Sequence, residues 1–167
     1  MATDALLEIT SPKIEGEGAD KDFPNTIEVL SFDLGSHQEA SIQTGSGLVG
    51  GGSGFEPLTV HKKFDKSTIK LFQHLCSGAR IEEMTLRVRR PGEGGATATN
   101  NAPVIYLMYK FKGVQVIDMS CDGNSGSAIP SETFAFNYTD IECHYREVKD
   151  GQPQGPVSMT YGLKKNR

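Results

Sequence analysis

The stretch IEVLSFDLG, at Ile27–Gly35, shows the pattern that decides the fold. Large apolar residues alternate there with small polar ones, in the order Leu30, Ser31, Phe32, Asp33, Leu34. Successive side chains of a β-strand point to opposite faces, so the alternation predicts a strand with one apolar and one polar face. We expect the three apolar side chains to enter a core and Ser31 and Asp33 to lie outside it.

The same period of two recurs along the chain. Further strand candidates, separated by Gly, Pro and Asn, are 3–10, 57–64, 81–90, 103–119, 134–145 and 157–164. Within 134–145 the apolar positions slip by one residue near Thr139, which predicts a β-bulge there. Gly113 is expected to mark a bend or a bulge inside the long strand 103–119.

One segment has helical periodicity instead. From Lys66 to Ser77 the apolar residues recur at spacings of three and four, at Ile69, Phe72, Leu75 and Cys76. Asp65 or Ser67 can cap the first turn, and Gly78 suits the position that ends a helix. We expect a short helix whose apolar stripe faces the core, with Cys76 as a buried structural thiol.

About seven strands and one short helix in 167 residues predict a single mainly β domain over 1–167. The expected architecture is a closed or nearly closed antiparallel β-barrel with the helix on its flank. No repeat or change of composition marks a second domain.

The segment 45–54 is rich in glycine and contains a literal GxGxxG at Gly45–Gly50. A dinucleotide site would need a helix directly after the motif, within a βαβ unit. The following glycines and Pro57 cannot begin a helix, so we interpret the segment as an extended loop between two strands. Histidines, cysteines and carboxylates form no catalytic or metal-binding pattern, and we expect neither an enzyme nor a cofactor.

Charge and cysteine content indicate a cytoplasmic protein. The chain has 17 basic and 21 acidic residues, and the net charge of −4 argues against a broad nucleic-acid surface. The longest apolar run, 103–109, is too short to span a bilayer, so membrane insertion is not expected. No secretory signal is visible at the N-terminus, and the three cysteines form no CxxC.

Taken in order, several motifs resemble the hemolysin-coregulated protein (Hcp) family of the type VI secretion system. They cover nearly the whole chain: IEVLSFDLG (27–35), FEPLTVHKKFDKSTIKL (55–71), CSGARI (76–81), YLMYKF (106–111), PSETFAFNYTDIECHY (130–145) and GPVSMTYGLKKN (155–166). The resemblance implies a barrel subunit that closes into a homo-hexameric ring. Rings would stack into a tube, inside a contractile sheath and behind a spike, and leave the cell without a signal peptide.

The resemblance also implies roles for particular residues. Ser31 and Asp33 would line the lumen and contact small effector proteins carried there. The Gly-rich segment would mediate ring stacking through Gly45, Gly47, Leu48, Val49, Gly50, Gly51 and Gly52. Other functions stay open at this point: a phage-type tail-tube subunit, a small-ligand barrel with an interior pocket, and a nucleotide-dependent enzyme.

Overall fold

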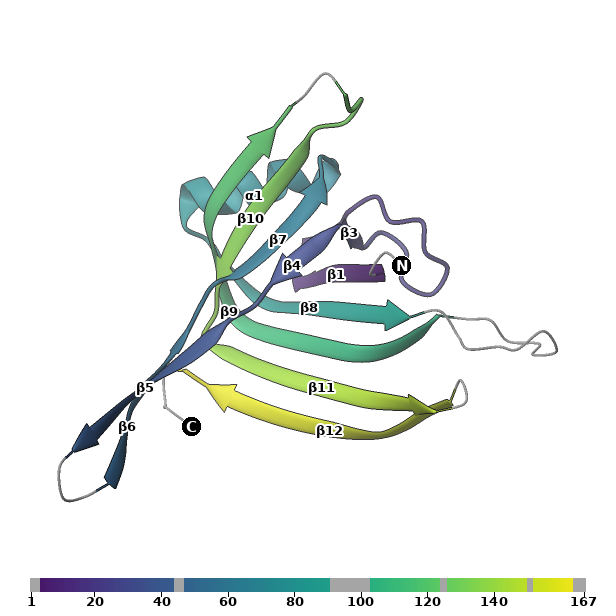
Figure 1. Cartoon of the computed structure of the whole chain (residues 1–167). Helices are drawn as coiled ribbons and strands as arrows, with labels where there is room; N and C mark the ends of the chain where they lie inside the picture. Colours follow the sequence, from purple (N-terminus) through teal and green to yellow (C-terminus); the bar gives the residue numbers. More distant parts are fainter. Residues whose placement is uncertain (1–3, 44–46, 91–102, 124–125, 150–151, 164–167) are drawn as a thin grey trace.

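The computed structural model describes residues 4–43, 47–90, 103–123, 126–149 and 152–163. Within these ranges the structure consists of antiparallel strands and one helix (Figure 1). In chain order the elements are β1 (Asp4–Ser11), β2 (Lys13–Ile14), β3 (Ile27–Val29), β4 (Ser31–Asp33), β5 (Ser36–Gln43), β6 (Gly47–Phe55), β7 (Leu58–Lys63), α1 (Lys66–Ser77), β8 (Arg80–Arg90), β9 (Val104–Asp122), β10 (Ser131–Asn137), β11 (Asp140–Lys149) and β12 (Gln152–Gly162).

The segment 27–33, which contains β3 and β4, connects the two sides of the barrel. A continuous ladder runs in the order β2–β1–β8–β9–β10–β7–β4. β3 pairs with β1, β4 pairs with β7, and Leu30 alone separates β3 from β4. The Leu30 amide donates a hydrogen bond of 2.8 Å to the carbonyl of His61. The segment 27–33 thus lies between β1 and β7, which are near opposite ends of the ladder, and the predicted antiparallel β-barrel fold is confirmed.

The long strand β9 belongs to two parts of the sheet. Its first half pairs with β11, its second half pairs with β10, and β8 pairs along the first half up to Gln115. Gly113 lies between the halves with a φ of 58°, a conformation that suits glycine. The expected bulge near Thr139 is instead a break between β10 and β11, whose residues pair with different halves of β9.

Aromatic side chains fill the barrel interior. Phe111, Phe134 and Phe136 are all 0% exposed. Phe32 and Leu34 pack against this core, as their alternation predicts. Leu30 was expected beside them but is 52% exposed. It lies just before the first paired residue of β4 and lines a shallow groove with Phe64 and Ile129 among others.

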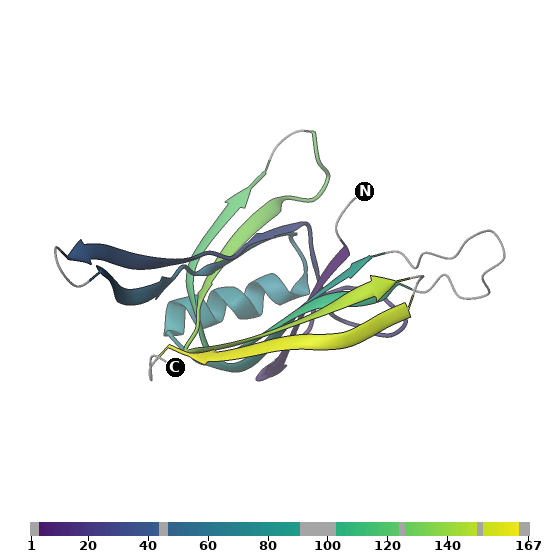
Figure 2. The same ribbon diagram turned by 60° about the horizontal axis from the view of Figure 1, so that its bottom comes forward.

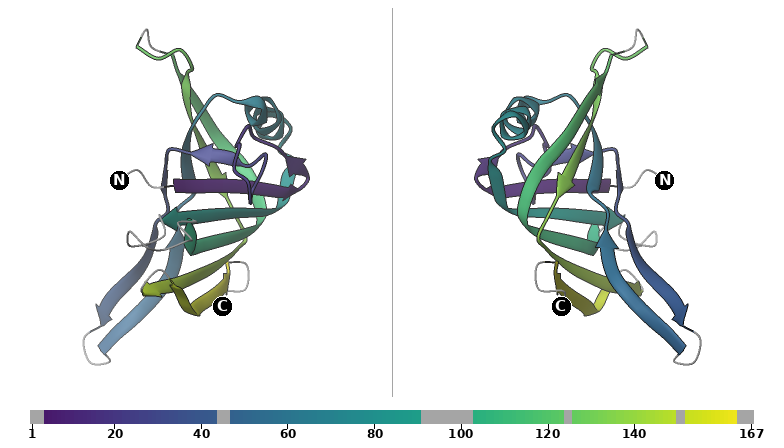
Figure 3. Two further views of the ribbon diagram at one scale, coloured as in Figure 1. Left: turned by 90° about the vertical axis from the view of Figure 1, so that its right-hand side faces the viewer. Right: turned by 90° about the vertical axis from the view of Figure 1, so that its left-hand side faces the viewer.

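Helix α1 has the predicted bounds and ends. Asp65 is the N-cap: its side chain accepts a hydrogen bond from the Ser67 amide, and Thr68 completes a capping box. Gly78 follows the helix with a φ of 67°, in the left-handed region. Figure 3 shows α1 at the side of the barrel away from β5 and β6. Among the described residues, no helix is long and apolar enough to cross a membrane.

The expected orientation of the helix is wrong for three of the four stripe residues, and only Leu75 packs against the core. Ile69 is 55% exposed, Phe72 is 48% exposed, and Cys76 is exposed rather than a buried thiol. The buried helix residues are Ser67, Thr68 and Leu71. The inward face is polar near the helix N-terminus because it docks on a buried ion pair, described next.

Lys62 of β7 and Glu132 of β10 form that ion pair. Their side chains are 1% and 0% exposed, and Nζ lies 2.5 Å from Oε1. The Lys62 ammonium also donates to Asp65 at 2.8 Å, and the Thr68 hydroxyl donates to Glu132 Oε1 at 2.5 Å. One buried network therefore joins two barrel strands to the first turn of α1.

The Gly-rich segment was expected to be an extended loop over 45–54, and this is wrong for the described residues. Gly47–Phe55 form β6, which pairs antiparallel with β5. Gly47 lies opposite Gln43 at one end of the pair, and Phe55 lies opposite Ser36 at the other. Glycine weakens a strand, but the backbone ladder to β5 remains available to it. Figures 1 and 2 show this hairpin extending away from the barrel.

Replacing Lys62 with Met should strongly destabilise the fold. The change leaves the Glu132 carboxylate buried without its counter-charge, a loss of about 3–5 kcal/mol in the free energy of unfolding. Urea denaturation at one fixed protein concentration measures it.

Two variants serve as controls for that measurement. Lys13→Met removes a surface pair with Glu15 at 2.6 Å and should change stability far less. Lys62→Met combined with Glu132→Leu should recover much of the lost stability, because no buried charge remains. If Lys62→Met is as mild as Lys13→Met, the buried pair does not hold the helix to the barrel.

The burial of Tyr138 leads us to expect that the protein loses stability at alkaline pH. Its side chain is buried, its hydroxyl donates to the Glu56 carbonyl at 3.2 Å, and burial raises the pKa of Tyr138 to about 12 from 10.0. Because the folded-state pKa is the higher one, this stabilisation is complete below about pH 10 and is lost as pH rises towards about 12. The stability advantage of the wild type over Tyr138→Phe should therefore shrink across that window.

Thermal unfolding of both proteins between about pH 9 and pH 12 checks this expectation. A difference between Tyr138→Phe and wild type that stays constant across that window would contradict the assignment.

Candidate functional site

Four neighbouring strands carry a polar face on the outside of the barrel. The register places Ser31, His61, Thr133 and Ser120 side by side across β4, β7, β10 and β9. The next row across the same strands is Asp33, Thr59, Ala135 and Asp118. All eight residues are exposed or half-buried. We define these two rows as the polar face.

The opposite side of the same strands faces the core. Phe32, Val60, Phe134 and Met119 form the row between the two polar rows and point inward. Alternation along each strand thus fixes the polar face once the core side is set. Helix α1 lies on the core side, because Thr68 bonds to Glu132, which precedes Phe134 by two residues. The polar face is therefore covered neither by the helix nor by the core.

Two features shape the polar face. Nδ1 of His61 lies 2.8 Å from the Thr133 hydroxyl, so this cross-strand contact restrains the imidazole. A shallow depression borders the second row and is lined by residues that include Asp33, Glu56, Thr59 and Ala135. Hydroxyls and carboxylates dominate the surface, and such a face can hydrogen-bond to a partner without presenting a large apolar area.

The structure agrees with the prediction for Ser31 and Asp33 and differs from it in the Gly-rich segment. Ser31 and Asp33 are both exposed on β4, on the side away from the core, as the alternation predicts. In the Gly-rich segment, Gly45 lies outside the described residues. The remaining residues predicted for ring stacking, 47–52, lie in strand β6.

Sequence reasoning missed the partners of Ser31 and Asp33. His61, Thr133, Asp118 and Ser120 join them only through the pairing of β4, β7, β10 and β9. The alternation in each strand could have identified these residues as outward-facing. Their rows depend on registers between strands far apart in sequence, which one sequence does not reveal.

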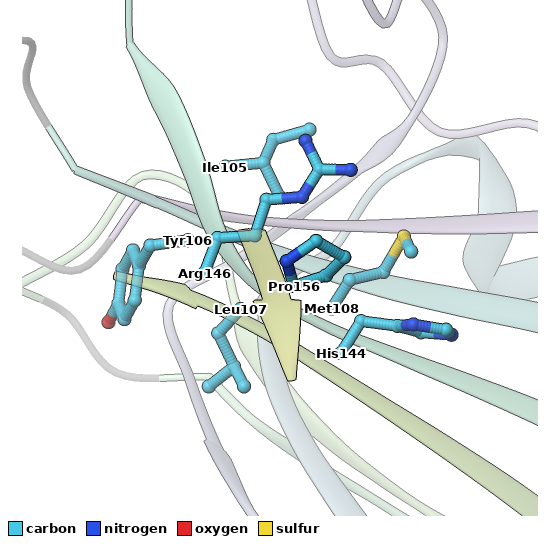
Figure 4. Close-up of a pocket in the computed structure, with 7 residues that line it drawn as sticks. All are labelled: Ile105, Tyr106, Leu107, Met108, His144, Arg146 and Pro156. Atoms are coloured by element: carbon cyan, nitrogen blue, oxygen red, sulfur yellow. The ribbon is translucent and has the colours of Figure 1, made fainter. Parts of the chain in front are cut away.

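A separate pocket lies on the surface of β9, β11 and β12 (Figure 4). Its lining includes Met108, His144 and Arg146. Nδ1 of His144 contacts the Ser158 hydroxyl at 2.8 Å, and Lys112 lowers the pKa of the neighbouring Glu142 through a hydrogen bond of 3.1 Å. Among the described residues, no group of three His, Cys, Asp or Glu could hold a metal ion.

The interior is unsuited to the small-ligand alternative. Such a barrel would use its inside as a pocket, whereas Phe111, Phe134 and Phe136 occupy that space with no exposed area. The nucleotide alternative needed a helix after GxGxxG, and the chain continues there as β6. The fold and its outer polar face instead define a β-barrel of the kind that acts through its surfaces.

Comparisons with known proteins identify the family. The family described as "Type VI secretion system effector, Hcp" matches residues 6–145, and the chain belongs to it. The expected role as a structural component of the type VI secretion system is thereby confirmed. No curated protein sequence gives a significant match to this chain.

Solved structures agree over the whole chain. A type six secretion system protein is 26% identical, covers 99% of both chains and has a TM-score of 0.87. Hcp1 from Salmonella typhimurium is 29% identical, with 100% and 99% of the two chains covered and a TM-score of 0.77. A type VI secretion system effector from Yersinia pestis is 23% identical, covers 95% and 99%, and shares the fold with a TM-score of 0.70.

Proposed function

We propose that this chain is the tube subunit of a type VI secretion system. Six copies close into a ring with the polar face towards the lumen, and the rings stack into a tube. Sheath proteins surround this tube, and a spike protein lies at its tip. The polar face carries the proposal: Ser31 and Asp33 belong to two registered rows on four strands, on the side away from the core and from α1. A lumen of this kind holds small effector proteins, which leave the cell with the expelled tube.

Ring closure needs two different surfaces on each copy, because neighbours in a ring meet head to tail. The sheet face of β11 and β12 supplies one, with Tyr145 opposite Val157 and Cys143 opposite Met159. Val157 is 72% exposed and Met159 is 51% exposed, although both lie in a regularly paired strand. The outer face of α1, with Ile69 and Phe72, is a second apolar surface. Monomers rarely leave such surfaces uncovered.

The β5–β6 hairpin supports stacking between rings. Neither of its strands pairs with any strand of the barrel, and it extends outward in Figure 2. An isolated two-stranded hairpin is marginally stable, and glycines raise the entropy lost on ordering. Contact with the next ring would offset that loss, which is our reason for assigning stacking to residues 45 and 47–52.

The purified protein should have about six times the mass of one 18.1 kDa chain. Multi-angle light scattering at tens of micromolar measures it. Val157→Glu should lower the mass towards a monomer, because a carboxylate cannot be buried in the seam without a partner. Glu28→Gln, at an exposed position of β3 outside both proposed seam surfaces, is the control. A wild-type monomer under these conditions would overturn the tube assignment.

Shortening the hairpin should separate stacking from ring formation. Replacing residues 41–49 with an Asn-Gly turn keeps the registered pair Ala40–Gly50 and removes the outer part of both strands. The ring of six copies and the unfolding midpoint should be retained, while tube formation, seen by electron microscopy, and secretion are lost. Unchanged secretion would show that the hairpin has no role in stacking.

A further inference from the structure

The charge of the polar face is mostly negative. Asp33 and Asp118 occupy the two ends of one row, and Glu56 borders the depression beside Asp33. The row next to the polar face, beyond Ser120 and Thr133, contains Lys63, Ser131 and Asp122, so one lysine lies beside the polar face. The whole chain has a net charge of −4, and these residues concentrate much of it on one surface.

The two row-end carboxylates are far apart. Thr59 and Ala135 lie between Asp33 and Asp118 on the intervening strands, and three strand spacings amount to roughly 14 Å. One metal ion cannot bridge such a span, whereas a protein surface can contact both ends. The residues between them offer hydroxyls and a small apolar side chain, which leave room for close approach.

We propose that the cargo meets this face with a basic protein surface, and that Asp33 and Asp118 set this preference. The inference rests on the proposed function, because it takes the polar face to line the lumen. Carboxylates only accept hydrogen bonds, and lysine and arginine side chains only donate them, so the two chemistries are complementary. Hydroxyls of Ser31, Thr59 and Ser120 accept further hydrogen bonds from the same partner.

The ring would strengthen this preference. Six copies place two circles of carboxylates around one channel, and a cleft lined by one sign of charge focuses its field on what enters. Exposed charge pairs are individually weak and are screened by salt. Cargo held in this way binds through many weak contacts and leaves readily when the tube disassembles. A neutral apolar lumen would give neither the charge preference nor the salt dependence.

Two fluorescent peptides of equal length test the inference on the purified ring. One alternates lysine with serine, and the other alternates glutamate with serine. Fluorescence anisotropy at about 50 mM salt should show binding of the lysine peptide only, with affinity falling as salt rises. Asp33→Asn and Asp118→Asn should each weaken that binding roughly two- to fivefold.

Glu28→Gln is the matched control. Glu28 is an exposed carboxylate on β3, paired with Leu6 of β1 and outside the polar face, so its replacement should leave the binding unchanged. Equal binding by wild type and by the Asp33→Asn, Asp118→Asn double variant would overturn the inference, and so would an equal loss in Glu28→Gln. Light scattering on the same samples separates the two proposals: an intact ring with no charge preference refutes only the cargo chemistry, whereas absence of the ring refutes the proposed function.

Discussion

The buried pair of Lys62 and Glu132 is the constraint on which the rest of the barrel depends. It joins neighbouring strands β7 and β10 on their core side and receives the first turn of α1 through Asp65 and Thr68. Burial of such a pair favours one arrangement, because any displacement leaves a charge without its partner. With the helix fixed on the core side, the other side of β7 and β10 is left free for contacts outside the chain.

The molecule uses one sheet for two purposes. Towards the inside, β4, β7, β10 and β9 supply apolar side chains to a core filled with aromatic rings. Towards the outside the same strands present hydroxyls, carboxylates and an imidazole in registered rows. Sheet β11–β12 and helix α1 add apolar side chains that stay exposed among the described residues. One polar face and separate apolar surfaces suit the proposed ring around a watery channel.

Local patterns in the sequence predicted the elements well and their surroundings less well. The bounds and caps of α1 follow from spacing and from Gly78, yet Ile69 and Phe72 face outward, because its buried face meets a charged pair. That pair could have been noticed, since Lys62 and Glu132 continue inward-facing rows of apolar residues. The β5–β6 hairpin was not predictable from its glycine-rich sequence, because backbone hydrogen bonds between the two strands, rather than side chains, give it a regular structure. Cross-strand rows such as Asp33–Asp118 depend on long-range register, which leaves no local trace.

A cryo-electron microscopy map of the assembled ring tests most directly whether the polar face lines the lumen. The account predicts a closed ring in which Ser31 and Asp33 of every copy point to the central axis, with His61 and Asp118 beside them on the same wall. The apolar surfaces of β11–β12 and α1 should lie in the seams between copies. A ring in which β4 and β7 face the outside, or in which the polar face is buried in a seam, would contradict it.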